Sequence, residues 1–358
     1  TLTSVEHIYA RTFGNHNDTY ELNLANATGV TQAWAWNIED TGGNNNDKLK
    51  FSGLSKSVTA GIKGGATVNT NRANVEWAFN DVTGPSDSAT LVVDGANVRD
   101  VTIGGVETLN IQATGANSTI GNLLNVTAAT KLVITGDKDL TIAGLDVANV
   151  NNEINASAFT GNLSVKLEGT AVNVTFKGGS GNDRVDMNGT LAAGDDIDGG
   201  AGTNTIAGIT APGQLTAATG QLLKNFQVFD AAGAAAGTYN MDHIKGSGTT
   251  STINSVVVSA DLGGNVVIDN LAEGAGVTIN ATTTAGLTVN QKGAADAGSN
   301  NDTLTFELVA PATGSDITVN ALTAADIETV IIKSMETAGV TSGHTLTAGT
   351  FANAQTVK

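Results

Sequence analysis

The chain contains no cysteine, and its 358 residues include only 3 proline, 4 histidine and 4% aromatic residues. Without cysteine no disulfide can brace the fold, although this neither indicates nor excludes an extracellular location. No apolar run approaches the length of a membrane-spanning helix, so the sequence predicts no membrane span. The scattered histidines form no H-E-x-x-H zinc motif and G-x-S-x-G is absent. We therefore expect that the chain is not an enzyme.

Basic residues are also scarce, with 17 Lys and Arg against 34 Asp and Glu and a net charge of −17. Nucleic-acid binding requires clustered positive charge, so nucleic acid is excluded as a partner, and divalent cations are the natural counter-ions. The 44 glycines, together with frequent Thr, Asn, Val and Ala, favour short strands joined by tight turns. A hydrophobic content of 40% is too high for a disordered chain.

The most informative stretch is Gly178–Ala207, which is rich in glycine and aspartate. Its first part, Gly178–Asp186, fits the nonapeptide G-G-x-G-x-D-x-U-x at every specified position, with Asp183 as the acidic residue and Val185 as the apolar one. Such a unit forms a glycine-rich turn and a short strand, and the aspartate offers the hard oxygen that Ca²⁺ prefers. The alternative is a glycine-rich surface loop without an ion.

Two degenerate copies follow this unit in phase. Thr190–Asp198 keeps Asp195 at the acidic position, whereas Gly199–Ala207 keeps the glycines and has Asn204 there. Two units make one turn of a parallel β-roll. We therefore expect the turns that begin at Gly178 and Gly199 to stack on one side of the roll, with Asp195 on the other.

The remaining chain alternates apolar and polar residues over short segments that end in glycine or asparagine, as stacked solenoid coils require. An all-β, calcium-binding parallel β-solenoid or β-roll with repeated modules is predicted, bent into two or more sub-domains. Short helices are possible at Thr216–Asn225 and Thr323–Glu328.

An internal repeat supports this fold. Leu109 aligns with Val228, and Asp183 with Asp302, at one common offset of 119 positions. The segment NNDKLKF, which contains Asp47, also matches NNDTLTF, which contains Asp302. The chain is therefore expected to begin near the end of one module and to stop within another. The predicted divisions are a β region at 1–100, a solenoid module at 101–210 with the calcium segment 178–207, a degenerate copy at 211–310 and the start of a third copy at 311–358.

With these motifs and the segments ETLNI, LVITGDKDLTI and INASAFTGNLSV, the chain resembles the RTX-type surface-layer (S-layer) proteins of Gram-negative bacteria, which a type I system exports. The resemblance implies a secreted structural protein on the cell surface. Its partner would be itself, as a calcium-dependent lattice or filament, with lipopolysaccharide or another surface glycan as an anchor.

The resemblance also implies a set of ligands for Ca²⁺. Carried over residue by residue, they are glycine carbonyls and turn side chains: Gly178, Gly179, Gly181, Asp183, Asp195, Gly199, Gly200, Gly202 and Asn204, with Asp47 and Asp302 as further candidates.

Two other functions stay open. The chain could be a segment of a secreted RTX adhesin that recognises surface glycans through Trp34, Trp36 or Trp77, although core packing is the commoner fate of tryptophan. It could also be a β-helix polysaccharide-degrading enzyme that uses Asp196 and Asp198. Strand alternation places those two side chains opposite Ile197, on the solvent face, without basic or aromatic neighbours in sequence.

Overall fold

The computed structural model describes residues 2–14, 17–40, 47–66, 72–124, 129–146, 152–169, 173–295, 302–310, 315–335 and 343–358. The chain forms a parallel β-solenoid of about 12 turns, with 55% strand and 3% helix, which confirms the predicted fold class. It divides into two compact units. We call Thr1–Val185 with Gly194–Gly202 the N-terminal unit, and Asp186–Ala193 with Thr203–Lys358 the C-terminal unit.

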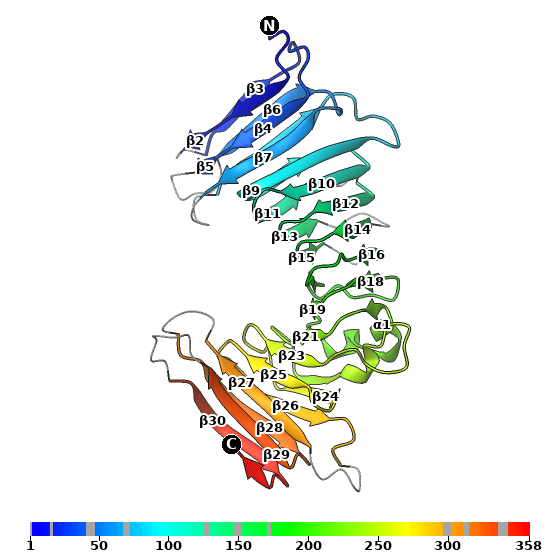
Figure 1. The fold of residues 1–358 in the computed structure, drawn as a ribbon, viewed down its shortest axis with the longest axis vertical. Coiled ribbons are helices and arrows are strands. Elements are labelled where there is room, and N and C mark those ends of the chain that lie inside the picture. The colour runs from blue at the N-terminus through cyan, green and yellow to red at the C-terminus, as the bar shows by residue number, and fades with distance from the viewer. Residues whose placement is uncertain are drawn as a thin grey trace. The chain divides into compact units, whose positions relative to one another are not determined.

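Two series of parallel strands build the N-terminal unit, and successive strands of each series lie side by side (Figure 1). The first series is β1 (His7–Ala10), β4 (Gln32–Trp36), β7 (Thr59–Gly65), β9 (Ser88–Ile103), β10 (Thr108–Thr114), β12 (Lys131–Gly136), β14 (Asn152–Phe159), β16 (Val174–Lys177) and β18 (Asp196–Asp198). The second is β3 (Thr19–Asn23), β6 (Lys48–Leu54), β8 (Asn74–Phe79), the end of β9, β11 (Ser118–Leu124), β13 (Leu140–Asp146), β15 (Leu163–Glu168) and β17 (Arg184–Asp186). A further short pair joins β2 (Phe13–Gly14) to β5 (Glu39–Asp40).

Strand β9 belongs to both series because it turns a corner. Its first half pairs with β7 and β10, and its second half pairs with β8 and β11. Gly95 lies between the halves with φ of +63°, a conformation that glycine adopts without strain.

Alternate residues of each strand point inward and form a continuous apolar core. On β10, Leu109 and Ile111 are fully buried, and they pair in register with Leu132 and Ile134 of β12. Burial of each such side chain contributes about 1.5–3 kcal/mol. The side chains between them face outward, so the two-residue alternation in the sequence defines the inner and outer faces.

The C-terminal unit also contains two parallel series. The first is β19 (Thr205–Ala207), β21 (Val228–Asp230), β23 (Ser255–Val258), β25 (Gly276–Ile279), β27 (Thr303–Val309), β29 (Thr329–Met335) and β31 (Thr356–Val357). The second is β22 (Gly237–Asn240), β24 (Val266–Leu271), β26 (Thr283–Gln291), β28 (Thr318–Ala325) and β30 (Thr345–Ala352). The remaining short elements are β20 (Leu223–Lys224), α1 (Ala217–Gly220) and the 3-10 turns η3 (Pro212–Gln214) and η4 (Met241–His243). In the described part of the chain, no helix has the length and apolarity to span a membrane.

Three local predictions need correction. The helix expected at Thr216–Asn225 is a single turn, α1, capped by the Thr216 side chain. The one expected at Thr323–Glu328 is wrong, because its first three residues belong to β28. The alignment of Leu109 with Val228 is one residue out of phase, since Phe229 and not Val228 is the buried residue. A shift of one residue moves a strand side chain to the opposite face.

Candidate functional site

Asp183, the acidic residue of the complete nonapeptide, is buried with 1% exposure. Its two carboxylate oxygens accept hydrogen bonds from the backbone N–H groups of Leu163 and Gly179, both at 2.8 Å. Burial raises the pKa of this carboxyl, and the two backbone hydrogen bonds oppose that shift. A methyl group on Gly178 would lie 2.2 Å from the carbonyl oxygen of Gly199, so two coils meet closely here. The side chain therefore joins neighbouring coils through the backbone.

The glycines of this segment stand in register on successive coils. A methyl group on Gly200 would come within 2.3 Å of the carbonyl oxygen of Gly179, and one on Gly202 within 2.2 Å of that of Gly181. Gly200 and Gly202 have φ of +79° and +88°. The predicted stacking of the Asp183 turn on the turn that follows Gly199 is therefore confirmed.

Asp195 lies on the other side of the roll, as expected. It is buried, and its Oδ1 accepts a hydrogen bond of 2.9 Å from the N–H of Val174, at the start of β16. Asn204, within the C-terminal unit, donates through Nδ2 to the carbonyl oxygen of Asn225 at 2.9 Å, and its N–H donates to Gln227 Oε1 at 2.8 Å. Both predicted ligands thus take part in backbone contacts between coils.

Asp47 differs from these residues because one of its oxygens lacks a hydrogen-bond partner. The side chain is fully buried, and Oδ1 accepts a hydrogen bond of 2.9 Å from the N–H of Asp18. Its Oδ2 is buried and has no hydrogen-bond partner among the residues that the structure describes. A second buried carboxylate, that of Asp40, accepts the N–H of Asp47 at 3.3 Å. The glycine-rich part of the predicted turn, 42–46, lies outside the described residues.

Asp302 has the same property in the C-terminal unit. It is 5% exposed, and its Oδ2 is buried with no hydrogen-bond partner in the described part of the chain. Burial raises the pKa of its carboxyl, and the negative charges of Glu328 and Glu273 raise it further. Gln291 Oε1 is another buried oxygen without a partner, and Gln291 Nε2 donates to the carbonyl oxygen of Thr303 at 3.1 Å. Among the described residues, two buried oxygens without a hydrogen-bond partner thus belong to Asp302 and to Gln291, which contacts the residue after Asp302.

The carboxylates of Asp47 and Asp302 fit a hard cation better than that of Asp183 does. A buried carboxylate oxygen without a hydrogen-bond donor is costly unless a cation neutralises it. Among the described residues there is no group of three His, Cys, Asp or Glu side chains close enough to hold a metal. A calcium ion, with about six to eight oxygen ligands, would therefore take most of them from carbonyl and amide groups beside the two carboxylates.

Asp196 and Asp198 lie on β18 on either side of Ile197, which is fully buried. Both acidic side chains are half-buried on the outer face, as the alternation predicts. Asp198 Oδ1 accepts the N–H of Gly200 at 2.9 Å and thereby stabilises the following turn.

The three tryptophans have different environments. Trp77 is 1% exposed, stacks on Phe51 with ring centroids 5.8 Å apart, and donates through Nε1 to the carbonyl oxygen of Ala33 at 3.2 Å. It is a core residue and cannot meet a glycan. Trp34 is half-buried and Trp36 is 46% exposed, so these two remain available at the surface.

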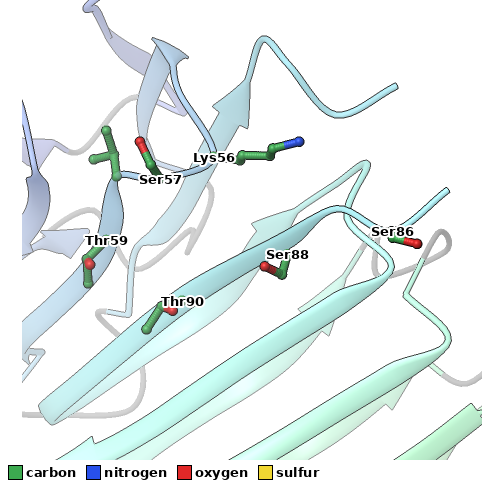
Figure 2. A pocket seen from close by; sticks show the side chains of 7 residues that line it. Lys56, Ser57, Thr59, Ser86, Ser88 and Thr90 are labelled. Atoms are coloured by element: carbon green, nitrogen blue, oxygen red, sulfur yellow. The ribbon is translucent and has the colours of Figure 1, made fainter. Parts of the chain in front are cut away.

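Sequence reasoning missed a polar hollow of about 350 Å³ between the starts of β7 and β9 (Figure 2). Hydroxyl side chains line most of it, together with the Lys56 stem and Val58: Ser57, Thr59, Ser86, Ser88 and Thr90. No motif marks such a site, because its members come from two different coils.

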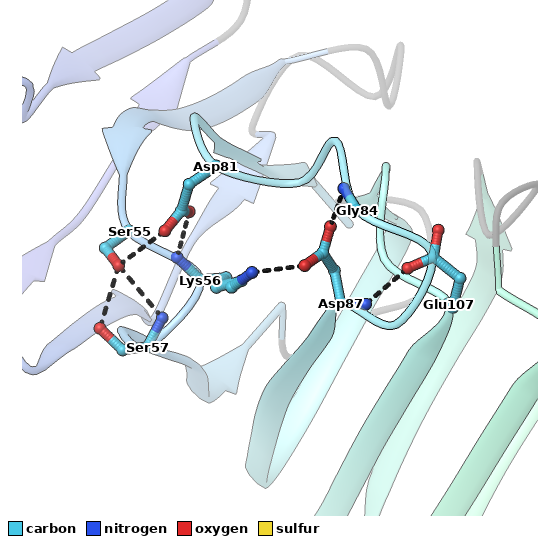
Figure 3. Close-up of polar contacts among 7 residues, drawn as sticks. All are labelled: Ser55, Lys56, Ser57, Asp81, Gly84, Asp87 and Glu107. Carbon is cyan, nitrogen blue, oxygen red and sulfur yellow. Dashed lines mark hydrogen bonds and ion pairs between the residues drawn. The ribbon is translucent and has the colours of Figure 1, made fainter.

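A charged network borders the hollow (Figure 3). Lys56 Nζ forms an ion pair with Asp87, whose other oxygen accepts the N–H of Gly84 at 2.8 Å. The N–H of Asp87 donates to Glu107 Oε2 at 2.6 Å, and that of Lys56 donates to Asp81 Oδ1 at 2.9 Å. The hydrogen bond to Lys56 lowers the pKa of Asp87, and the same bond raises the pKa of Lys56. Both groups are therefore charged at neutral pH and fix the rim of the hollow.

Comparison with known proteins leaves the family undetermined. No protein-family model matches the chain. No curated protein matches it either.

Proposed function

We propose that the chain is a structural, self-assembling surface-layer module that forms a calcium-dependent lattice outside the cell. The observation that carries the proposal is that Asp47 and Asp302, at the same place in a repeated motif, each bury an oxygen without a hydrogen-bond partner. The resemblance to RTX-type surface-layer proteins and the net charge of −17 support the same assignment.

Calcium would neutralise these turns when bound. Asp47 and Asp302 would hold it first, with nearby carbonyl and amide oxygens, because each buries an Oδ2 without a hydrogen-bond partner among the described residues. Asp183 would be a secondary ligand because backbone N–H groups engage both of its oxygens, and so would Asp195, which accepts the N–H of Val174. In a calcium-poor cytoplasm the acidic turns destabilise the folded coils, whereas outside the cell bound ions favour folding. Calcium would thus couple folding and assembly to export.

Assembly requires a rigid body with repeated surfaces, and stacked coils provide both. Each coil presents the next row of outward polar side chains at one strand spacing, so two copies can make the same contact many times. The chain itself is therefore the proposed partner, and a surface glycan is the proposed anchor.

The test is negative-stain electron microscopy of the purified protein, dialysed in parallel against millimolar calcium and against a chelator. We expect ordered sheets or filaments with calcium and dispersed particles without it. The double variant Asp47→Asn, Asp302→Asn should lose the calcium response, whereas Asp137→Asn, which alters an exposed carboxylate paired with Lys138, should keep it. Dispersed particles of the parent protein in both conditions would overturn the lattice proposal for this chain.

A further inference from the structure

The outward face of the first strands carries an aromatic group formed by Tyr9, Trp34 and Trp36. The Tyr9 and Trp34 rings are stacked at an interplanar angle of 16°, with centroids 6.1 Å apart. Trp36 meets Tyr9 edge-on at 6.4 Å. Tyr9 is 53% exposed and Trp36 46% exposed, so the group offers apolar ring surface to solvent.

The fold fixes the orientation of Trp34 within this group. Trp34 pairs in register with Gly61 of β7, and a methyl group on Gly61 would come within 2.2 Å of the Trp34 ring. The indole therefore lies over the backbone of the next coil. Its Nε1 donates to Gln32 Oε1 at 2.8 Å, which fixes its orientation. The rings are preorganised, and binding a flat ligand would cost little side-chain entropy.

The hydroxyl-lined hollow lies beside the aromatic group on the same face. Gln32, two residues before Trp34, pairs in register with Thr59, which lines the hollow. Ala60 pairs with Leu91, so Thr59 and Thr90 also lie on neighbouring strands and point outward with the aromatic group. Figure 2 shows the Thr59, Thr90 and Ser88 side chains along these strand ends. Neighbouring strands are about 4.8 Å apart, so the rings and hydroxyls are within reach of one oligosaccharide.

The charged residues near this face disfavour anionic ligands. Lys56 is paired with Asp87, and Lys63 is paired with Asp94 at 2.9 Å, so neither lysine is free to neutralise an anion. The whole chain carries a net charge of −17, which repels polyanions. A ligand that matches this face therefore carries no negative charge.

The geometry points to a binding site for a neutral oligosaccharide on the outward face of β1, β4, β7 and β9. The apolar C–H face of one pyranose ring lies on the exposed rings of Tyr9 or Trp36, and the hydroxyls of the adjoining ring exchange hydrogen bonds with Thr59, Thr90 and Ser88. Binding sites commonly combine an apolar platform with a few polar groups that fix orientation. This site does not depend on lattice formation and would equally serve an isolated molecule.

The experiment is calorimetric titration of the full chain in chelator, after circular dichroism has confirmed that it is folded there, with neutral cello- and chito-oligosaccharides and with anionic oligogalacturonate. We expect binding of a neutral probe and none of the anionic one. Trp36→Ala and Tyr9→Ala should each weaken binding about fivefold, and Thr90→Val about threefold. The matched controls are Trp77→Phe, in the core, and Thr175→Val, an outward threonine of β16, and neither should change affinity.

A second readout uses tryptophan fluorescence, because the exposed indoles should shift on binding while the signal from Trp77 stays constant. Absence of binding to every neutral probe would overturn the site, as would unchanged affinity in both Trp36→Ala and Tyr9→Ala. The site would also be overturned if these variants instead abolished self-association, since the face would then be a contact between copies. Failure of the lattice in calcium, by contrast, would leave this result unaffected.

Discussion

The indole of Trp34 lies over Gly61 of the next coil, at a distance that leaves no room for a methyl group. The two residues pair in register on β4 and β7, so the contact arises directly from parallel stacking. Gly61 is required here because any side chain would overlap the indole. Its φ lies outside the left-handed region, so the backbone conformation is not what requires glycine. An aromatic ring is thus accommodated by removing a side chain from its neighbour.

Gly61→Ala should displace Trp34 from the sheet. The new methyl group would overlap the ring, and relief of such overpacking costs about 1–3 kcal/mol. We expect a lower free energy of unfolding in urea and a red shift of tryptophan emission. Gly213→Ala is the matched control, because a methyl group there meets nothing within 4 Å and should change neither quantity. An unshifted emission spectrum in Gly61→Ala would contradict the packing described for Trp34.

Asp183→Ala should destabilise the N-terminal unit whether or not calcium is present. The substitution leaves the buried N–H groups of Leu163 and Gly179 without their acceptor, which costs about 2–4 kcal/mol in total. Urea unfolding in chelator measures this directly. If the loss occurred only in calcium, Asp183 would act as an ion ligand and not as a backbone acceptor.

The control for that variant is Asp137→Ala. Asp137 is exposed and forms a surface ion pair of 2.8 Å with Lys138, so its removal should change the free energy of unfolding little. A similar loss in both variants would indicate a general charge effect and not a specific acceptor role.

Asp302→Asn should stabilise the protein in chelator at neutral pH. The pKa of Asp302 is raised above 3.8 in the folded chain, so its charged form is disfavoured there, and stability falls as pH rises from 3.8 through the folded pKa. The advantage of the variant should therefore disappear below pH 3.8. In calcium the order should reverse, because only the parent carboxylate gains stability from the ion. Thermal unfolding across pH, with and without calcium, measures both effects.

Asp261→Asn should change stability in the opposite direction and destabilise the protein at neutral pH. Thr284 donates to this carboxylate through N–H and Oγ1, both at 2.8 Å, and these hydrogen bonds lower the pKa of Asp261 below 3.8. Its stabilisation is present above pH 3.8 and is lost as pH falls through the folded pKa. We expect the variant to be slightly less stable at neutral pH, because solvent screens this exposed carboxylate, and this difference to vanish in acid. Thermal unfolding across the same pH series measures this difference. A difference that did not change with pH would contradict the role assigned to the hydrogen bonds from Thr284.

The local pattern of the sequence was sufficient to predict the faces of most strands. NNDKLKF and NNDTLTF illustrate this, because Asp47 and Asp302 are buried, and the apolar residues two and four positions later are buried in both segments. The alignment of Val228 with Leu109, which is one residue out of phase, shows where a constant repeat offset fails. The coil lengths differ, so a constant offset cannot hold across every strand.

The tryptophans show a second limit. Composition alone did not distinguish Trp34, Trp36 and Trp77. In the strand alternation, however, Trp77 stands two residues after buried Val75 and points inward, whereas Trp34 and Trp36 stand at outward positions. The inward and outward positions of each strand could in principle be predicted from its sequence. The pairing of Trp34 with Gly61 was not, because it depends on the register between two coils.

The sequence by itself determined the class of fold, the inward and outward faces and the positions of the acidic turns, since two-residue alternation and glycine-rich corners are local properties. Only the tertiary structure decided which acidic oxygens lack a hydrogen-bond partner and which polar residues meet. Contacts between coils join residues 20 positions apart at Leu163 and Asp183 but 31 apart at Lys56 and Asp87. Because coil length varies in this way, the partners of a side chain follow from stacking and not from spacing along the chain.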